Sequence, residues 1–216
     1  MELTALDSSA ILEDRPFTHP ARASADLAVL NRLLSQLRAA LHAQLFRPRD
    51  GLLFQEWQDE ADLGQRIIIR QGVELRSYLE IVVVGFFAER REAAPAGPIS
   101  ELDDELIRAL VENDEVLCYF TSQLPGGQYG NLVLLASEEA KVRWNMHPHH
   151  IWAVRELAPD FYHNVRLHNG FLDGGILCCD GPVLTVTKYY DYDLGTQAGT
   201  PWRGVRRWTP PLRLHI

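Results

Sequence analysis

Residues 131–170 read NLVLLASEEAKVRWNMHPHHIWAVRELAPDFYHNVRLHNG, and this stretch decides the fold class. It begins with an apolar run, Asn131–Ala136, which is typical of a strand that is buried on both faces. Ser137 then occupies the position of a helix N-cap, and apolar residues follow it at steps of three and four. From Phe161 to Phe171 polar and apolar residues alternate, which predicts a strand with two different faces. The stretch therefore predicts the order strand, helix, strand.

The helix in this stretch has one apolar stripe, and a proline interrupts the helix near its middle. The stripe contains Ala140, Trp144, His147, Ile151 and Val154. Pro148 lies inside the helix and removes a backbone donor, so we expect a kink or a break between Asn145 and His149. Ala158 and Pro159 are expected to end the helix.

The preceding residues supply a strand, a helix and another strand. Tyr78–Glu89 is apolar on both faces and should be a central strand. A linker at Pro95–Pro98 precedes a helix with Ser100 as its N-cap, and a strand is expected at Val116–Thr121. A turn at Pro125, Gly126 and Gly127 then leads into the stretch quoted above.

The order from Leu79 to Gly170 is strand, helix, strand, strand, helix, strand, which is that of the ferredoxin-like fold. In that fold the first and third strands are central and the fourth is an edge, in agreement with the alternating pattern of the last strand. We therefore expect an α+β protein with a ferredoxin-like βαββαβ core in residues 79–172 and an antiparallel sheet. Residues 1–78 would add a helix and a strand, and residues 173–216 a strand pair and a tail, in one globular unit.

Two added segments flank this core. Leucines recur at helical steps before Pro48, with Ser24 as the expected N-cap and residues 1–23 as an extended arm. The leucines are Leu27, Leu30, Leu34, Leu37, Leu41 and Leu45. An acidic loop is expected at Gln55–Asp62 and a strand at Arg66–Arg70. Near the C-terminus we expect a strand at Val183–Tyr190.

Composition limits the class of protein. The apolar fraction is 46% and the charged fraction 23%, as in an ordinary globular protein. The net charge of -8 disfavours nucleic-acid binding, which needs a basic surface. The chain starts without a basic region followed by an apolar run and contains no apolar stretch of membrane-spanning length. Its three cysteines are an odd number and two are adjacent, so we expect reduced thiols, a cytoplasmic location and no membrane contact.

The segments NLVLLASEEAKVRW, HPHH and FYHNVRLHNG resemble those of the dimeric α+β barrel proteins, a group with a ferredoxin-like fold. The group includes antibiotic-biosynthesis monooxygenases and haem-degrading proteins, and no single family's catalytic set matches this chain. The resemblance implies a homodimer in which the open sheet face encloses a pocket for a small molecule. It thereby implies a small-molecule-binding protein, with cofactor-independent oxygenase or isomerase activity as one form. The alternative is a non-catalytic protein that uses the sheet for oligomerisation or partner binding, with Trp202 and Trp208 in the interface.

Four polar residues of the last core strand should share one face: Tyr162, Asn164, Arg166 and His168. Arg166 and His168 could hold a carboxylate or an enolate and move a proton, so they are the candidate catalytic residues. Tyr162 and Asn164 are candidate ligand-binding residues. The alternative is that this face is a solvent-exposed or dimer-facing edge.

A second candidate site is the cluster His147, Pro148, His149 and His150. If the helix continued through Pro148, His147 and His150 could bind one divalent metal ion, but a third ligand is not evident. Haem is a further alternative, in a pocket lined by Trp144, Phe86 and Phe120. We favour neither cofactor: His147 and Trp144 are more simply ligand-binding or packing residues.

Overall fold

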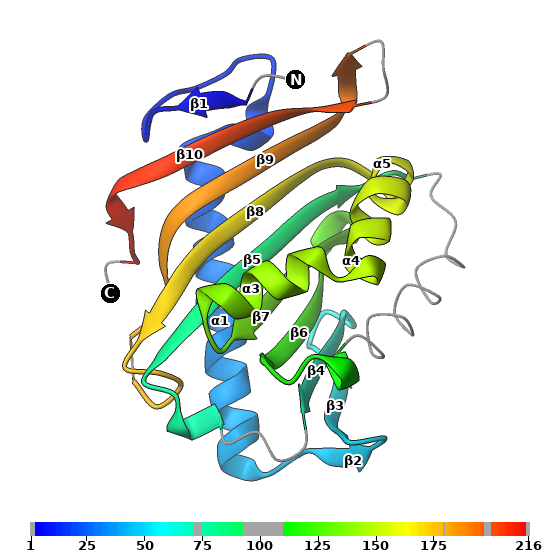
Figure 1. Ribbon diagram of the computed structural model, residues 1–216, viewed down its shortest axis with the longest axis vertical. Coiled ribbons are helices and arrows are strands. Elements are labelled where there is room, and N and C mark those ends of the chain that lie inside the picture. The colour runs from blue at the N-terminus through cyan, green and yellow to red at the C-terminus, as the bar shows by residue number, and fades with distance from the viewer. Residues whose placement is uncertain (1–2, 71–74, 93–109, 179, 197–199, 215–216) are drawn as a thin grey trace.

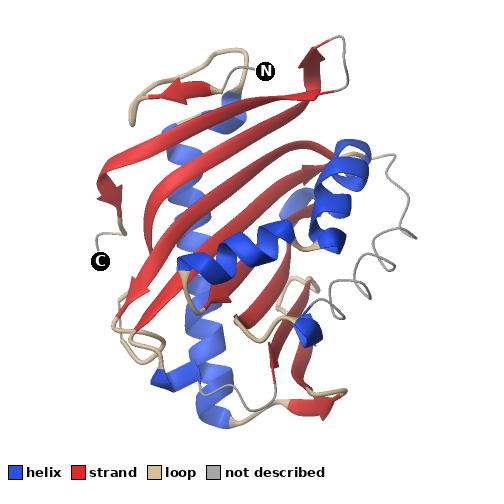
Figure 2. Ribbon diagram, viewed as in Figure 1, coloured by secondary structure: helices blue, strands red, loops and turns tan. Residues whose placement is uncertain are grey.

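The computed structural model describes residues 3–70, 75–92, 110–178, 180–196 and 200–214. The protein is α+β, with one ten-stranded sheet in the order β1-β10-β9-β8-β5-β7-β6-β4-β3-β2 (Figure 1). All neighbouring strands are antiparallel except β1 and β10, which are parallel. Helices lie on both faces of the sheet (Figure 2).

The strands are β1 (Thr4–Leu6), β2 (Arg47–Arg49), β3 (Leu52–Gln58), β4 (Gly64–Arg70), β5 (Glu80–Arg90), β6 (Val116–Leu124), β7 (Gln128–Leu135), β8 (Tyr162–Asp173), β9 (Val183–Thr196) and β10 (Thr200–Leu212). The helices are η1 (Pro16–Thr18), α1 (Pro20–Ala43), η2 (Leu75–Ser77), η3 (Pro125–Gly127), α3 (Glu138–Met146), α4 (Pro148–Trp152), η4 (Ala153–Leu157) and α5 (Ala158–Phe161). The strands predicted from the sequence at β4, β5, β6, β7, β8 and β9 are confirmed. The linker and the helix expected from Ser100 fall mainly on residues 93–109, which lie outside the described residues.

The centre of the sheet has the strand order β8-β5-β7-β6. β5 and β7 are central, as their apolar residues predicted. β8 is not an edge strand, because β9 pairs with it along most of its length. Its alternating pattern therefore does not reflect exposure to solvent: its polar face is buried.

Helix α1 covers one face of the sheet. It begins at Pro20, and the ring nitrogen Nδ1 of His19 accepts from the backbone N–H of Ala21, so the predicted cap at Ser24 is wrong. Proline suits the first turn because its missing N–H would have had no helical partner. Leucines of α1 pack on β4, β5, β6 and β7 in the largest core cluster. A side-chain carbon at Gly85 would come within 2.8 Å of Leu30, so this glycine lets the helix approach β5 closely.

Helices α3 to α5 cover the opposite face. Ser137 caps α3 by accepting from the N–H of Ala140, as predicted. The helix breaks at His147, whose backbone is extended, and α4 restarts at Pro148, which confirms the break expected there. The chain stays helical as far as Phe161, because Pro159 lies in the first turn of α5, where proline is tolerated. None of the helices in the described part of the chain is both long and apolar enough to cross a membrane.

Two further expectations were wrong. The acidic loop expected from Gln55 begins later, because residues 52–58 form β3 and pair with β4 along their whole length. Leu52 and Phe54 pack in one core cluster, and Leu53 and Trp57 pack against the other. The Trp- and Arg-rich tail is strand β10, which pairs with β9. Its residues Trp202 and Trp208 lie on the face covered by α1, as the register of the two strands requires.

Candidate functional site

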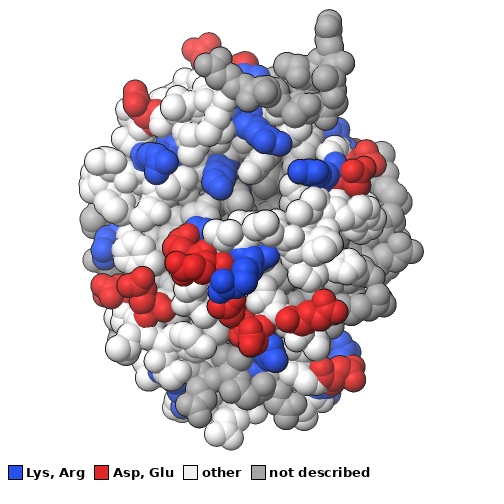
Figure 3. Space-filling view, in the orientation of Figure 1, with Lys and Arg blue, Asp and Glu red and all other residues white. Residues whose placement is uncertain are grey.

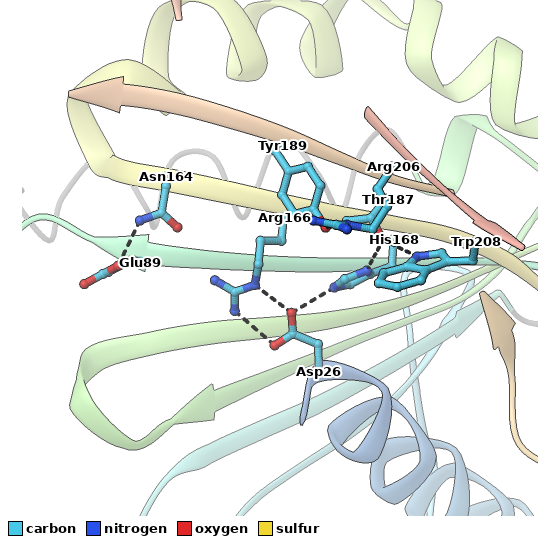
Figure 4. A network of polar contacts seen from close by, with 9 residues as sticks. All are labelled: Asp26, Glu89, Asn164, Arg166, His168, Thr187, Tyr189, Arg206 and Trp208. Atoms are coloured by element: carbon cyan, nitrogen blue, oxygen red, sulfur yellow. Dashed lines mark hydrogen bonds and ion pairs between the residues drawn. The ribbon is translucent and has the colours of Figure 1, made fainter. Parts of the chain in front are cut away.

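Two side chains of β8 meet one carboxylate of α1 inside the protein (Figure 4). Arg166 donates from Nε to Asp26 Oδ2 at 2.6 Å and from Nη2 to Asp26 Oδ1 at 3.0 Å. His168 Nε2 lies 2.8 Å from Asp26 Oδ2. The three residues are buried, with 6%, 5% and 0% exposure for Arg166, Asp26 and His168. The pair Arg166 and His168 predicted from the sequence is thus brought together, with a partner that sequence reasoning missed.

The other nitrogen of His168 is also engaged. An ionised carboxylate only accepts, so His168 Nε2 carries a hydrogen and donates a hydrogen bond to Asp26. Nδ1 lies 2.9 Å from Thr187 Oγ1, and the same oxygen accepts from Trp208 Nε1 at 2.9 Å. Hydrogen bonds therefore hold the imidazole on both sides, and proton exchange between His168 and a ligand stays a prediction.

The charge of Asp26 is stabilised by its partners. Burial alone would raise the pKa of Asp26, but the hydrogen bonds and positive charge of His168 and Arg166 outweigh it. The pKa of the carboxyl group is consequently lowered from its ordinary value. Asp26 remains ionised at neutral pH and fixes the Arg166 guanidinium in one orientation.

A second buried arginine, Arg206, has a different role. It donates from Nη2 to the carbonyl oxygens of Ala10 and Thr18 at 2.8 and 2.9 Å, and it also contacts Asp7 O. Its Nε donates to the hydroxyl of Tyr189 at 3.1 Å. Arg206 thereby fastens the N-terminal arm to β10.

A cavity of about 340 Å³ lies beside this network. Its walls come from the segment before α1, the 3₁₀ helix η1, the start of α1 and parts of β5, β7, β8 and β9. Its lining residues are Asp14, Pro16, Phe17, Arg22, Glu89, Gln128, His163, Asn164, Arg166, Asp191 and Asp193. Arg166 and Asn164 thus reach the cavity, whereas His168 is not among its lining residues.

Asn164 offers an unsatisfied acceptor to this cavity. Its Nδ2 donates to Glu89 Oε2 at 2.8 Å. Because a carboxylate cannot donate, this bond also fixes which amide atom faces Glu89. Oδ1 therefore points the other way, toward the Arg166 side (Figure 4), and it is buried without a hydrogen-bond partner among the described residues. Such an orphaned acceptor is uncommon in a native protein and calls for a ligand or water.

A histidine that sequence reasoning passed over also lines the cavity. His163 Nδ1 lies 2.8 Å from Asp193 Oδ2, and Arg91 Nη2 lies 2.7 Å from Asp193 Oδ1. Because an ionised carboxylate only accepts, Nδ1–H of His163 donates to Asp193, and this contact orients the ring. The alternating pattern of β8 had placed His163 on the opposite face from Asn164.

A bulge in β8 explains this difference and corrects the position of Tyr162. The pairing with β5 shifts between Glu89 opposite Asn164 and Arg90 opposite Tyr162. An extra residue in one strand reverses the faces of the side chains beyond it. Tyr162 consequently packs on Phe86, with ring centroids 5.6 Å apart, on the face opposite to the buried network.

The histidine cluster lies elsewhere, at the junction of α3 and α4. Trp144 is 6.3 Å from the His147 ring and 5.6 Å from the His150 ring, measured between centroids. The helix does not continue through Pro148, so the metal-binding spacing proposed for His147 and His150 is not formed. In the ranges that the structure describes, no group of three or more His, Cys, Asp or Glu residues could hold a metal ion.

The three aromatic residues proposed to line a haem pocket do not lie together. Phe120 packs in the core cluster under α1. Trp144 packs on the opposite face, beneath α3, and Phe86 also lies on that face. Trp144 and His147 are therefore separated by the sheet from the network of Asp26.

These features define an α+β protein with a buried Asp–Arg–His network that borders a polar cavity. No protein-family model and no curated protein matches the chain. One solved structure, titled "Crystal structure of aldoxime dehydratase", is similar with a TM-score of 0.25 and 12% sequence identity. The match covers 79% of this chain and 42% of that one, so the chain spans less than half the length of the dehydratase. A TM-score this low supports no inference about function.

Proposed function

We propose that the protein binds a small polar molecule in the cavity beside Asn164 and Arg166. The observation that carries this proposal is the buried, unsatisfied Oδ1 of Asn164, which lines the cavity. A volume of about 340 Å³ is at the lower end of that of ligand pockets, so the ligand is small. Nine of the lining side chains are polar or charged, which favours a hydrophilic ligand.

The buried network positions Arg166 for this role. Two of its guanidinium nitrogens bind Asp26, and the third, Nη1, has no hydrogen-bond partner among the described residues. In Figure 4 this nitrogen points toward the side where Asn164 and Glu89 lie. Because Asp26 is itself held by His168, the network limits the motion of the donor and lowers the entropy lost on binding. Asp26 and His168 are therefore positioning residues in this proposal.

The test is a ligand screen with paired variants. Small polar metabolites are screened by thermal shift and then by calorimetry against the wild-type protein, Asn164→Leu and Asn145→Leu. Asn145 is exposed on α3 and serves as the matched control. We expect at least one compound whose affinity falls about tenfold or more in Asn164→Leu only. A ligand bound equally well by all three proteins would contradict the cavity as its site.

A second candidate is an enzyme, such as a cofactor-independent oxygenase or isomerase. The pair His163 and Asp193 at the cavity favours this possibility, because an imidazole that a carboxylate orients can exchange a proton with a bound ligand. In that case His163, rather than His168, acts as the base. His163→Gln should then abolish turnover of a ligand found in the screen and leave its affinity within about threefold. Turnover that persists in His163→Gln would exclude this role.

We also propose a homodimer formed by the sheet face opposite α1. Helices α3 to α5 cover part of this face, but in Figure 1 none of the described helices lies in front of β9 and β10. Lys188, Arg203 and Arg207 are exposed there, and in Figure 3 acidic side chains gather lower on the same side of the molecule. A two-fold axis through this face would pair the basic region of each copy with the acidic region of the other. A mass near 24.5 kDa by light scattering at all concentrations would refute the dimer.

A further inference from the structure

The cavity wall includes a donor and an acceptor that are held in fixed positions and have no partner among the described residues. The acceptor is Asn164 Oδ1, whose orientation is imposed by Glu89. The donor is Arg166 Nη1, whose orientation is imposed by Asp26. Both side chains are more than nine-tenths buried, with 7% and 6% exposure. A ligand that fills the cavity therefore has to present a donor to Asn164 and an acceptor to Arg166.

The charges at the cavity divide into compensated and uncompensated ones. Asp14 and Asp191 both pair with Arg15. Asp193 pairs with Arg91 and His163. The lining residues Glu89 and Arg22 have no ion-pair partner among the described residues.

The two uncompensated charges have opposite sign, and each belongs to the cavity lining. Glu89 is hydrogen-bonded to Asn164, so the negative charge lies next to the free acceptor. Arg22 and Arg166 supply positive charge. A site with both signs of charge discriminates against a ligand that carries only one sign of charge. Such a ligand would leave one charged side chain of the site unpaired or would lie next to a like charge.

We propose that the ligand is a small zwitterion with a primary ammonium group and a carboxylate, as in a free amino acid. This inference rests on the proposed function of the cavity. The ammonium group donates to Glu89 and to Asn164 Oδ1, and the carboxylate accepts from Arg166 Nη1 and from Arg22. Both contacts are charge-assisted hydrogen bonds, which are stronger than neutral ones.

Other classes of ligand fit less well. A polyamine would place positive charge beside Arg166 and leave its Nη1 without an acceptor. A dicarboxylate would place negative charge beside Glu89 and leave Asn164 Oδ1 without a donor. A neutral sugar could satisfy both hydrogen-bonding atoms, but it would form no charge-assisted hydrogen bond with Glu89 or Arg22, which are both exposed residues at the cavity.

The test is calorimetry at pH 7 with the free proteinogenic amino acids and with derivatives of the best binder. The derivatives are the amine that lacks the carboxylate and the N-acetyl acid that lacks the ammonium group. We expect each derivative to bind about 10- to 100-fold more weakly than the amino acid. Glu89→Gln should weaken the amino acid by a similar factor and leave the N-acetyl acid unchanged. Glu60→Gln, in the exposed loop between β3 and β4, is the matched control and should bind like the wild type.

Three results would overturn the inference. If no amino acid binds with a Kd below about 1 mM, the ligand is not of this class. The inference also fails if either derivative binds as well as the amino acid, or if Glu89→Gln has no effect. Succinate, spermidine and glucose are tested as well, so that a wrong ligand class can be distinguished from a cavity that binds no ligand. Binding of one of these compounds that is lost in Asn164→Leu would leave the site in place with another ligand class.

Discussion

Replacing Asp26 by Asn is the sharpest test of the buried network. The change keeps the size of the side chain and removes its charge. Arg166, which is 6% exposed, would then have no carboxylate partner among the described residues, and one amide N–H₂ would face the donors of Arg166 or His168. Breaking a buried pair by removing one partner costs about 3–5 kcal/mol. Because about 2–4 °C of thermal midpoint corresponds to 1 kcal/mol at this chain length, we expect a fall of about 6–20 °C.

Urea unfolding followed by tryptophan fluorescence measures the free energy of unfolding directly. Asp50→Asn is the matched control, since Asp50 is exposed and both residues tolerate its positive φ of 52°. It should stay within about 0.5 kcal/mol of the wild type. The double variant Asp26→Leu/Arg166→Met removes both charges. The free energy of unfolding that it loses should be about 0.5–3 kcal/mol smaller than the sum of the losses in Asp26→Leu and in Arg166→Met. Additive losses, or an Asp26→Asn protein within about 1 kcal/mol of the wild type, would refute the network as described.

Three other predictions concern the same core. The lowered pKa of Asp26 means that its ionised form stabilises the folded protein at pH values above the ordinary pKa of 3.8. The difference in free energy of unfolding between the wild type and Asp26→Asn should therefore narrow as the pH falls below about 4. A difference that widens in acid would contradict this prediction. Trp208→Phe removes the hydrogen bond from the indole N–H to Thr187 and should lower the free energy of unfolding by about 1 kcal/mol, less than Asp26→Asn, as measured by urea unfolding. Burial raises the pKa of the Cys118 thiol far above its ordinary value, so an aromatic disulfide reagent should modify Cys178 in the native protein and Cys118 only after unfolding, as peptide mass spectrometry can show.

The sheet was largely predictable because its strands carry simple patterns. Apolar runs on both faces identified β5 and β7 as central, and Ser137 and Pro148 marked the start and the break of the helix after β7. The position of β8 was misjudged, since a strand with a buried polar face has the same alternating pattern as an edge strand. Only the contact with α1 distinguishes the two, and that contact joins residues 140 positions apart in the chain.

The site was partly predictable for a similar reason. Arg166, His168 and Asn164 were placed correctly on one face, whereas Tyr162 was not, because the bulge of β8 leaves no clear mark in the sequence. Asp26 could have been identified from the sequence. It precedes Leu27 on the apolar stripe of α1, and an acidic residue at such a position is rarely buried without a partner.

The orphaned acceptor could not be predicted. The sequence contains both Glu89 and Asn164, but their pairing depends on the register of β5 and β8. The same register and the loop before α1 create the cavity, whose lining residues range from Asp14 to Asp193. Local patterns carry no information on such an assembly.

The most direct test of the cavity as the binding site is a crystal structure of the protein with the tightest ligand from the screen. We expect the ligand to occupy the cavity with a donor atom at about 2.7–3.2 Å from Asn164 Oδ1 and an acceptor at a similar distance from Arg166 Nη1. A ligand bound elsewhere, with only water in the cavity and no ligand atom bonded to Asn164 Oδ1, would contradict this expectation.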